Sequence, residues 1–492
     1  MKPTKNIKIV LLLLSSIINE LYGQTYNHLV PNVVFPYQLN SGKLPENTYI
    51  LISPLKLNSN PTDKNYISPK PIIIDHNGYV FWYMNSSSGS IGDFKYSSKD
   101  SLFCFTKYLN GIASYQLMDL KFNFVDSILN TNNVLSDAHE FQKLSNGNYI
   151  IGGMKDSIMD LSKLNYNGKP GSKTTNVRGY VIQEFNKQHK LVFEWNSNNY
   201  IHPKESFESY GYDSTKYDYA HGNSIEEDAD GNLLISLRYL NSIYKINHQN
   251  GKIIWKLGGK SSSFSFTNDL GFSGQHDARR LTNDAISLFD NANTSKEPKT
   301  SRIIQYKLDT LNWTATKIWE YNQPFFVKSL GSYQVVNDDT HLINNGFSFR
   351  PNPSVVIINK LKENIATLTF KDSVMCYRSF CFEIPFQIKQ PKILHANIGN
   401  KTILVAPDGV KNYLWSTGDT TQIIIADKRT TYQVWTNYGT GMLGSLPIDL
   451  NKITNDDFYL CNKNQKKISS PKYGETYFIK SPNGIETTII WK

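Results

Sequence analysis

The feature that most constrains the fold is a repeated unit of short strands separated by polar turns. The clearest copy spans residues 221–257, where HGNSIEE, NLLISLR, SIYKIN and KIIWKL each read as a strand. Asp230-Gly231 lies between the first two segments, and this dipeptide is typical of a tight hairpin. Four antiparallel strands in about forty residues is the size of one β-propeller blade.

The second strand of this unit recurs along most of the chain. Its copies are YILIS (49–53), SLFCF (101–105), NYIIG (148–152), NLLIS (232–236), AISLF (285–289) and THLIN (340–344). The outer strand pair also recurs, and four copies end in a tryptophan: Trp82, Trp195, Trp255 and Trp319. Large aromatic residues at a repeated position usually fill core, so we assign these side chains to packing. Six units between about Asn32 and Phe370 predict an all-β chain built on a six-bladed β-propeller.

The chain of 492 residues is long enough for a propeller and further small modules. We expect the propeller over residues 24–390, a small Ig-like β-sandwich over 391–452 and a short C-terminal β module over 453–492. YLWSTGDTTQ resembles the immunoglobulin-like modules of secreted bacterial proteins. The last stretch, ETYFIKSPNGIETTIIWK, resembles the sorting domain of proteins exported through the type IX secretion route, and an ordinary terminal β module is the alternative.

The N-terminus is typical of a secretory signal. Lys2, Lys5 and Lys8 precede a short apolar stretch over residues 9–18, and we expect residues 1–23 to be a signal peptide. That stretch is too short for a membrane span. The sequence thus predicts an exported protein that is periplasmic, displayed on the cell surface or secreted.

Four cysteines, Cys104, Cys376, Cys381 and Cys461, could oxidise in such a compartment. Cys376 and Cys381 are close enough in sequence for a small loop disulfide, although four cysteines allow three pairings. CxxC pairs are absent, so the spacing does not indicate a zinc site. The formal charge of +10 comes from scattered lysines and arginines. The chain has no recognised nucleic-acid module. These charges favour a generic basic surface, which could also exert some attraction on anionic substrates.

Three histidines occupy equivalent places in successive units. His139, His221 and His276 each begin the first strand of a unit. Because that strand lines the central channel of a propeller, we expect the three imidazoles to face one axis. The chain turns at Asp230-Gly231 and returns as an antiparallel strand, so we expect Arg238 to lie almost opposite His221. Three imidazoles and one guanidinium at the same channel mouth predict a site for an oxyanion such as sulfate, phosphate or carboxylate.

These segments resemble the PAPS-independent aryl sulfotransferases, over most of residues 30–370. The resemblance is strongest in DAHEFQKLSNGN, in HGNSIEEDADGNLLISLRYLNSIYKINHQNGKIIWKLGG and in FSGQHDARRL followed by ISLFDN. It implies a ping-pong transfer of a sulfuryl group from a phenolic sulfate ester to a phenol. It further implies that His276 is the nucleophile, and that His139, His221 with Asn223, and Arg238 complete the active site. Since the sulfuryl group would be held on His276, the resemblance implies no cofactor and no diffusible sulfate carrier.

Tyr219 and Tyr239 flank these motifs, and each could stack on an aryl ring or pack at a blade edge. Two other interpretations stay open. The three histidines with Asp137, Glu140 or Asp277 could hold Mn or Zn in a propeller lyase or hydrolase, although Arg238 would repel a cation. The propeller could also be a binding module at the cell surface without catalytic activity. The sequence favours small-molecule substrates over nucleic acid, and it leaves open the balance between transferase and sulfatase activity.

Overall fold

The computed structural model describes residues 25–26, 29–41, 44–56, 67, 69–85, 89–166, 168–209, 211, 216–282, 284–294, 299–348, 351–371, 374–398, 401–426, 430–453, 459–481 and 484–490. The predicted signal peptide over 1–23 lies outside these residues. Strands dominate the structure, and the helices that it describes are three short 3-10 helices, η1 (Ser197–Asn199), η2 (Pro203–Glu205) and η3 (Arg238–Leu240). Within the described part of the chain, no helix has the length and apolar character needed to cross a bilayer.

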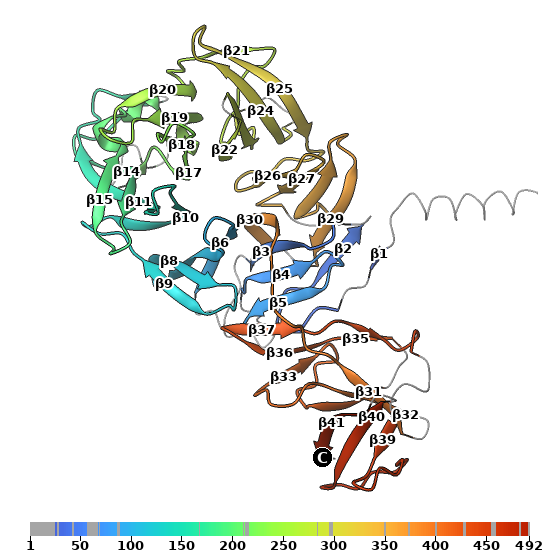
Figure 1. Ribbon diagram of the computed structural model, residues 1–492. Coiled ribbons are helices and arrows are strands. Elements are labelled where there is room, and N and C mark those ends of the chain that lie inside the picture. The colour runs from blue at the N-terminus through green and yellow to red at the C-terminus, as the bar shows by residue number, and fades with distance from the viewer. Residues whose placement is uncertain are drawn as a thin grey trace, which may run out of the picture.

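Six of the described sheets stand around a common centre, like the blades of a propeller (Figure 1). In ring order they are β30–β3–β4–β5 (Val374–Glu383, Thr48–Lys56, Ile72–Asp75, Val80–Met84), β6–β7–β8–β9 (Ser90–Ser97, Leu102–Leu109, Ile112–Asp119, Phe124–Ile128), β10–β11–β14–β15 (Leu135–Lys143, Tyr149–Met159, Thr175–Phe185, Leu191–Asn196), β17–β18–β19–β20 (Gly222–Glu227, Leu233–Leu237, Ser242–Ile246, Ile253–Gly258), β22–β23–β24–β25 (His276–Thr282, Ala285–Asp290, Arg302–Asp309, Thr314–Asn322) and β26–β27–β28–β29 (Ser332–Asn337, Thr340–Asn344, Val355–Asn359, Asn364–Phe370). The first strand of each sheet lies nearest the centre, and these strands contact one another in a closed ring: β30, β6, β10, β17, β22, β26 and β30 again.

Strands from opposite ends of the repeat region close the ring. β30 follows the last sheet in sequence, yet it pairs with β3 and supplies the inner strand of the first sheet. On the other side, β2 (Tyr37–Ser41) adds an outer strand to β29. Both junctions use backbone hydrogen bonds, so the ring is held shut by sheet pairing.

Apolar side chains fill the space between neighbouring sheets. Trp82, Trp195 and Trp255 each lie in the fourth strand from the centre, β5, β15 and β20, and are buried, as the packing assignment requires. Trp82 stacks on Phe122 with ring centroids 4.3 Å apart. Trp319 is half-buried and stacks on Tyr333 of the next sheet. These contacts fix the angle between blades, so they also fix where the inner strands point.

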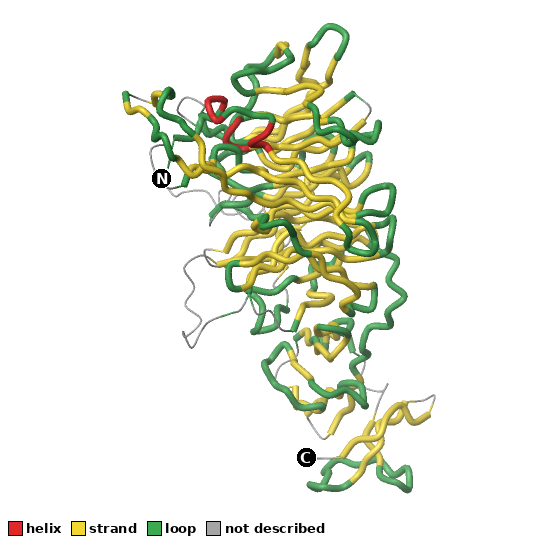
Figure 2. Tube along the Cα trace, turned by 90° about the vertical axis from the view of Figure 1, so that its left-hand side faces the viewer, coloured by secondary structure: helices red, strands yellow, loops and turns green. Residues whose placement is uncertain are grey.

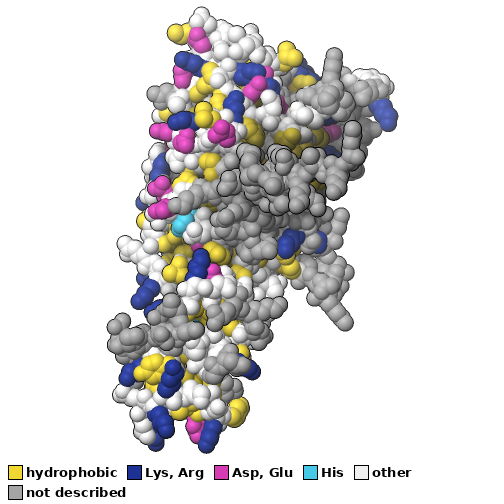
Figure 3. Space-filling model, turned by 90° about the vertical axis from the view of Figure 1, so that its right-hand side faces the viewer, with side chains coloured by type: hydrophobic (Ala, Val, Ile, Leu, Met, Phe, Trp, Pro, Cys, Tyr) yellow, Lys and Arg dark blue, Asp and Glu magenta, His cyan; other side chains and the backbone are white. Residues whose placement is uncertain are grey.

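The C-terminal strands are joined to the ring by a continuous sheet. β37 (Gly441–Gly444) pairs with β5, and β36 (Val434–Tyr438) and β33 (Tyr413–Trp415) extend that sheet away from the ring. A second sheet combines β34 (Ile423–Ala426), β32 (Lys401–Val405), β31 (Leu394–Ile398), β39 (Tyr459–Cys461), β40 (Thr476–Ser481) and β41 (Gly484–Ile490). This second sheet therefore contains strands from both sides of residue 452. Figure 2 shows the C-terminal strands below the ring, and on the face in Figure 3 Lys and Arg side chains gather at this end.

The four cysteines are buried and free. Cys376 and Cys381 both lie on β30, five positions apart along an extended strand. Five positions correspond to about 16 Å, which is far beyond the Cα separation of a disulfide. The loop disulfide suggested by their closeness in sequence is therefore wrong. Burial also raises the pKa of the Cys104 and Cys381 thiols to about 12, so both stay protonated and unreactive.

Candidate active site

Three inner strands bring His139, His221 and His276 together. His139 lies in β10, His276 is the first residue of β22, and His221 directly precedes β17. The rings of His139 and His221 meet edge to face, with centroids 5.0 Å apart. The pKa of His276 is held well below its usual value by burial first, and then by the positive charge of Arg238, His221 and His139. The structure therefore brings the predicted residues together. We call His139, His221, His276 and Arg238 the histidine cluster.

Arg238 reaches the cluster because of the hairpin register. Gly222 pairs with Leu237, and the backbone N–H of Arg238 donates to the carbonyl oxygen of His221 at 2.9 Å. Its guanidinium lies over the ring of Tyr239, 5.1 Å from the centroid, and that ring is 4.8 Å from the imidazole of His221. The guanidinium Nε is buried and has no hydrogen-bond partner among the described residues. Arg238 therefore keeps unused donor capacity for an anion in the cluster.

The hydrogen bonds of His276 define which of its nitrogens carries the proton. The amide nitrogen of Asn291 donates to the carbonyl oxygens of Val327 and Leu330, so its Oδ1 faces the imidazole. His276 Nδ1 lies 2.7 Å from this oxygen and 3.1 Å from the carbonyl oxygen of Gly274. Both neighbours are acceptors, so Nδ1 carries the hydrogen and Nε2 keeps its lone pair. A neutral imidazole with a free lone pair at Nε2 is the form that can attack an electrophile.

In the structure, this lone pair already has a partner. The backbone N–H of Leu330 donates to His276 Nε2 at 3.2 Å, and the imidazole is only 1% exposed. Leu330 has a φ of 64°, which is unusual for a leucine, and its neighbour Lys328 accepts a hydrogen bond from Arg238 through its carbonyl oxygen. The segment between β25 and β26 thus covers the reactive nitrogen.

The other two imidazoles are paired with carboxylates. His139 Nδ1 lies 2.5 Å from Asp137 Oδ1, and His221 Nδ1 lies 3.0 Å from Asp218 Oδ2. Burial alone would lower the pKa of His139, but the charge and hydrogen bond of Asp137 outweigh it and raise that pKa above its usual value. The pKa values of His139 and His276 are therefore shifted in opposite directions, which favours the cationic form of His139 and the neutral form of His276. Such a difference between neighbours is typical of an acid and a nucleophile working together.

The remaining predicted residues differ in how they relate to the cluster. Asn223 is fully buried, donates from Nδ2 to the carbonyl oxygen of Gln275, and keeps Oδ1 without a partner among the described residues. Tyr239 borders the cluster, as described above. Tyr219 does not, because it lies in an apolar core and its hydroxyl donates to Ser197 and to the carbonyl oxygen of Ile201. Its position beside the motif therefore reflects packing.

Below the cluster, six charged side chains form a closed network across the channel. Arg378, which is fully buried, contacts Asp93 at 2.8 Å and Glu140 at 3.0 Å, and its Nε lies 3.3 Å from Asp277. Lys95 pairs with Asp93 and Glu140, and Arg279 pairs with Glu140 and Asp277. Three cations balance three carboxylates, so the network is neutral as a whole. We call these six residues the ion network.

The ion network and Asp137 use the carboxylates that a metal site would need. Glu140 and Asp277 are bonded to guanidinium groups, and Asp137 is bonded to His139. Across the residues that the structure describes, no group of three or more His, Cys, Asp or Glu side chains is arranged to hold a metal ion. The geometry thus lends no support to the lyase or hydrolase interpretation.

Sequence reasoning did not identify several groups that shape the site. Asn291, Asp218 and the Leu330 amide act on the imidazoles, and Tyr377 and Arg378 enter from β30. The ring of Tyr377 lies 5.3 Å from that of His139, and its hydroxyl donates to the carbonyl oxygen of Asn223. Asn291 ends the ISLFDN motif, so the motif itself carried a signal.

Three comparisons with known proteins were informative to different degrees. No curated protein matches the chain significantly. Among solved structures, the chain is similar to a protein of unknown function from Bacteroides caccae, with 13% identity, 68% of this chain and 98% of that chain covered, and a TM-score of 0.42. It is also similar to TolB from Acinetobacter baumannii, with 10% identity, 68% of each chain covered and a TM-score of 0.39. Residues 115–350, which contain the whole histidine cluster, match the model of the arylsulfotransferase (ASST) family, and this match supports the resemblance to that family.

Proposed function

We propose that the protein is a PAPS-independent aryl sulfotransferase, and that it moves a sulfuryl group from a phenolic sulfate ester to a phenol through a sulfohistidine. The observation that carries this proposal is the opposite shift of two pKa values in one cluster: the pKa of His276, whose lone pair lies at Nε2, is lowered, and the pKa of His139 is raised. In this proposal the ring is a six-bladed propeller within residues 24–390, and the reaction takes place at one end of its central channel.

The first half of the reaction forms a bond between His276 Nε2 and sulfur. The bond between sulfur and the aryl oxygen breaks, and the leaving oxygen takes a proton from His139. Asn291 supports this step, because its Oδ1 accepts a hydrogen bond from the Nδ1–H of His276 and so keeps the lone pair on Nε2. In this step Arg238 and His221 face the sulfuryl oxygens. A donor fixed in such a position stabilises the transition state by about 2.7–4 kcal/mol.

The second half reverses these movements with a new phenol. The acceptor hydroxyl gives its proton to His139, which is neutral after the first half, and its oxygen attacks the sulfur. The bond between Nε2 and sulfur breaks, and the electron pair returns to His276. The hydrogen on Nδ1 stays with His276 throughout, so the ring is cationic while it carries the sulfuryl group and leaves readily. Tyr239, which stacks beside His221, is placed to contact the aryl ring.

The Leu330 amide must give up its contact with Nε2 before this attack. The donor therefore binds with a shift of the segment that precedes β26, and the freed N–H then becomes available to a sulfuryl oxygen. We also propose that the chain is exported with residues 1–23 as a signal peptide, that residues 391–452 form an Ig-like module, and that residues 453–492 serve as a secretion sorting domain. The substrates in this proposal are small molecules.

The test is release of nitrophenol from nitrophenyl sulfate, with and without a phenol acceptor. We expect release that depends on the acceptor, and loss of release in His276→Ala. His189→Ala is the matched control, because His189 lies in a turn and pairs only with Asp126 among the described residues, and it should leave the rate unchanged. Equal release without an acceptor would instead identify a sulfatase. No release from any aryl sulfate, with the fold intact, would contradict the proposal.

A further inference from the structure

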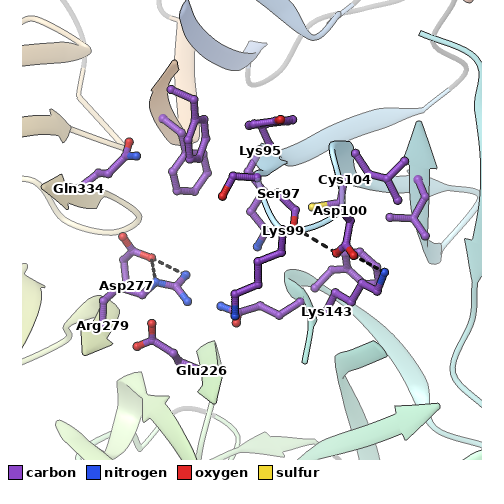
Figure 4. Close-up of a pocket in the computed structure, with 18 of the residues that line it drawn as sticks. Lys95, Ser97, Lys99, Asp100, Cys104, Lys143, Glu226, Asp277, Arg279 and Gln334 are labelled. Carbon is purple, nitrogen blue, oxygen red and sulfur yellow. Dashed lines mark hydrogen bonds and ion pairs between the residues drawn. The ribbon is translucent and has the colours of Figure 1, made fainter. Parts of the chain in front are cut away.

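The lower half of the central channel contains a cavity that the proposed reaction does not use. Its volume is about 390 Å³, within the range of small-molecule sites. Three residues of the ion network line one end of this cavity: Lys95, Asp277 and Arg279. The cavity therefore lies on the other side of the network from the histidine cluster. We call this cavity the lower chamber, and Figure 4 shows the side chains around it.

Phe380 and Phe382 of β30 form an aromatic wall on one side of the lower chamber. Phe141 from β10 and Tyr333 from β26 add aromatic side chains elsewhere in its lining. Phe380 and Phe382 stack with ring centroids 6.0 Å apart. Aromatic faces in a concave site bind flat apolar groups well, so this wall suits the ring of a ligand.

Most charges around the chamber are already compensated. Lys143 pairs with Asp100 at 2.5 Å, and Lys95 and Arg279 are held by the ion network. Two charged groups are different. Among the described residues, the ammonium of Lys99 makes no ion pair, and the carboxyl group of Glu226 accepts a hydrogen bond only from the backbone N–H of Arg280. In Figure 4 both side chains point into the space.

Glu226 adds a polar group whose charge varies near neutrality. Burial, its largest influence, raises the pKa of Glu226 to about 7. The groups that face it are Arg279 and Asp277 on β22 and Glu140 on β10, with Lys99 across the chamber after β6. Below this pKa, Glu226 is neutral and can donate a hydrogen bond. Lys99 then leaves the chamber with one uncompensated positive charge.

We propose that the lower chamber binds a small aromatic carboxylate, with its ring on the Phe380 and Phe382 wall and its carboxylate between Lys99 and Glu226. The ammonium and the carboxylate form a charge-assisted hydrogen bond, and Glu226 donates a second one. This site is separate from the sulfuryl-transfer site. Its occupancy therefore does not depend on whether the proposed function is correct.

Titration calorimetry of the full chain with phenylacetate tests the proposal, since this probe has no sulfate and no phenolic hydroxyl. We expect a dissociation constant of about 1 mM, which is usual for so small a ligand. The neutral phenylacetamide should bind about tenfold more weakly, and Lys99→Ala should weaken phenylacetate by about tenfold, because each removes one charge-assisted contact. Lys99→Arg should keep the affinity, and His276→Ala should leave it unchanged.

The pH dependence provides a second, independent readout. As the pH rises through about 7, Glu226 ionises and repels the ligand, so the affinity of the wild-type protein should fall. Glu226→Gln cannot ionise, and its affinity should stay level over the same interval. The proposal is overturned if phenylacetate shows no saturable binding, or if Lys99→Ala binds it as well as the wild-type protein does while melting at the same temperature.

Discussion

The two ends of the central channel are built on the same inner strands but carry different chemistry. On β22, His276 belongs to the histidine cluster, Asp277 to the ion network, and Arg279 borders the lower chamber. β10 repeats this order with His139, Glu140 and Phe141. One to three residues along a strand therefore separate a cluster imidazole from a side chain of the ion network and from the lining of the lower chamber.

The two regions differ in whether their buried charges are paired with opposite charges. In the ion network every cation meets a carboxylate, so the buried charges are neutralised in place. In the histidine cluster Arg238 and His276 have no carboxylate partner among the described residues, which leaves a positive field in a buried site. The neutral ion network thus separates the lower chamber from the histidine cluster. The positive charge of the cluster has no carboxylate beside Arg238 in the described part of the chain and can be compensated by a bound anion.

The largest expected effect concerns the fold, and it comes from breaking the ion network. Arg378→Met removes one cation and leaves three carboxylates against two cations in a buried site. We expect the free energy of unfolding to fall by about 3–5 kcal/mol, measured by urea denaturation. Arg178→Met is the control, because the pair of Arg178 with Asp156 is partly exposed and should be worth about 1 kcal/mol or less. Equal losses in the two variants would show that the network is not a buried charge centre.

The next effect compares one cation from each end of the channel. Arg238→Ala should lower kcat/KM for an aryl sulfate by about 10²–10³-fold, because it removes a fixed donor to the sulfuryl oxygens. Lys99→Ala should change the same quantity by about twofold at most, since the charge of Lys99 is exposed and screened. Steady-state kinetics at one ionic strength measures both. Similar losses in the two variants would contradict the division between the two ends.

The smallest effect is a shift of a pH profile. Asp137 raises the pKa of His139, so the cationic acid persists to a higher pH than an ordinary histidine, and activity is lost as the pH rises through that raised pKa. Asp137→Asn removes the charge, so the alkaline limb of kcat should move to lower pH. The acidic limb should stay in place, because it reflects protonation of His276 well below its usual pKa. Asp126→Asn, beside the exposed His189, should leave the profile unchanged, and an unmoved alkaline limb in Asp137→Asn would rule out His139 as the acid.

The sequence predicted the parts of the site that depend on local pattern. Equivalent positions in successive units indicated that His139, His221 and His276 face one axis, and hairpin geometry indicated that Arg238 lies opposite His221. Both arguments use periodicity and register over a few residues, which a single sequence contains. The resemblance to the aryl sulfotransferases drew on the same segments, and the family match agrees with it.

The sequence could not supply the parts that depend on contacts between distant segments. Tyr377 and Arg378 reach the channel only because β30 pairs with β3 from the other end of the ring. The Leu330 contact uses a backbone amide, which has no residue signature. Tyr219 lies beside a motif in the sequence, and this position allowed either a contact with an aryl ring or packing. Only the structure shows that its side chain points into the core.

The most direct test of the account is the intact mass of the protein after incubation with an aryl sulfate and no acceptor. The account predicts the added mass of one sulfuryl group, located on His276 by peptide mapping and discharged when a phenol is added. His276→Ala should stay unmodified. Acceptor-dependent turnover without any adduct, or with the adduct on another residue, would contradict the assignment of His276 as the nucleophile.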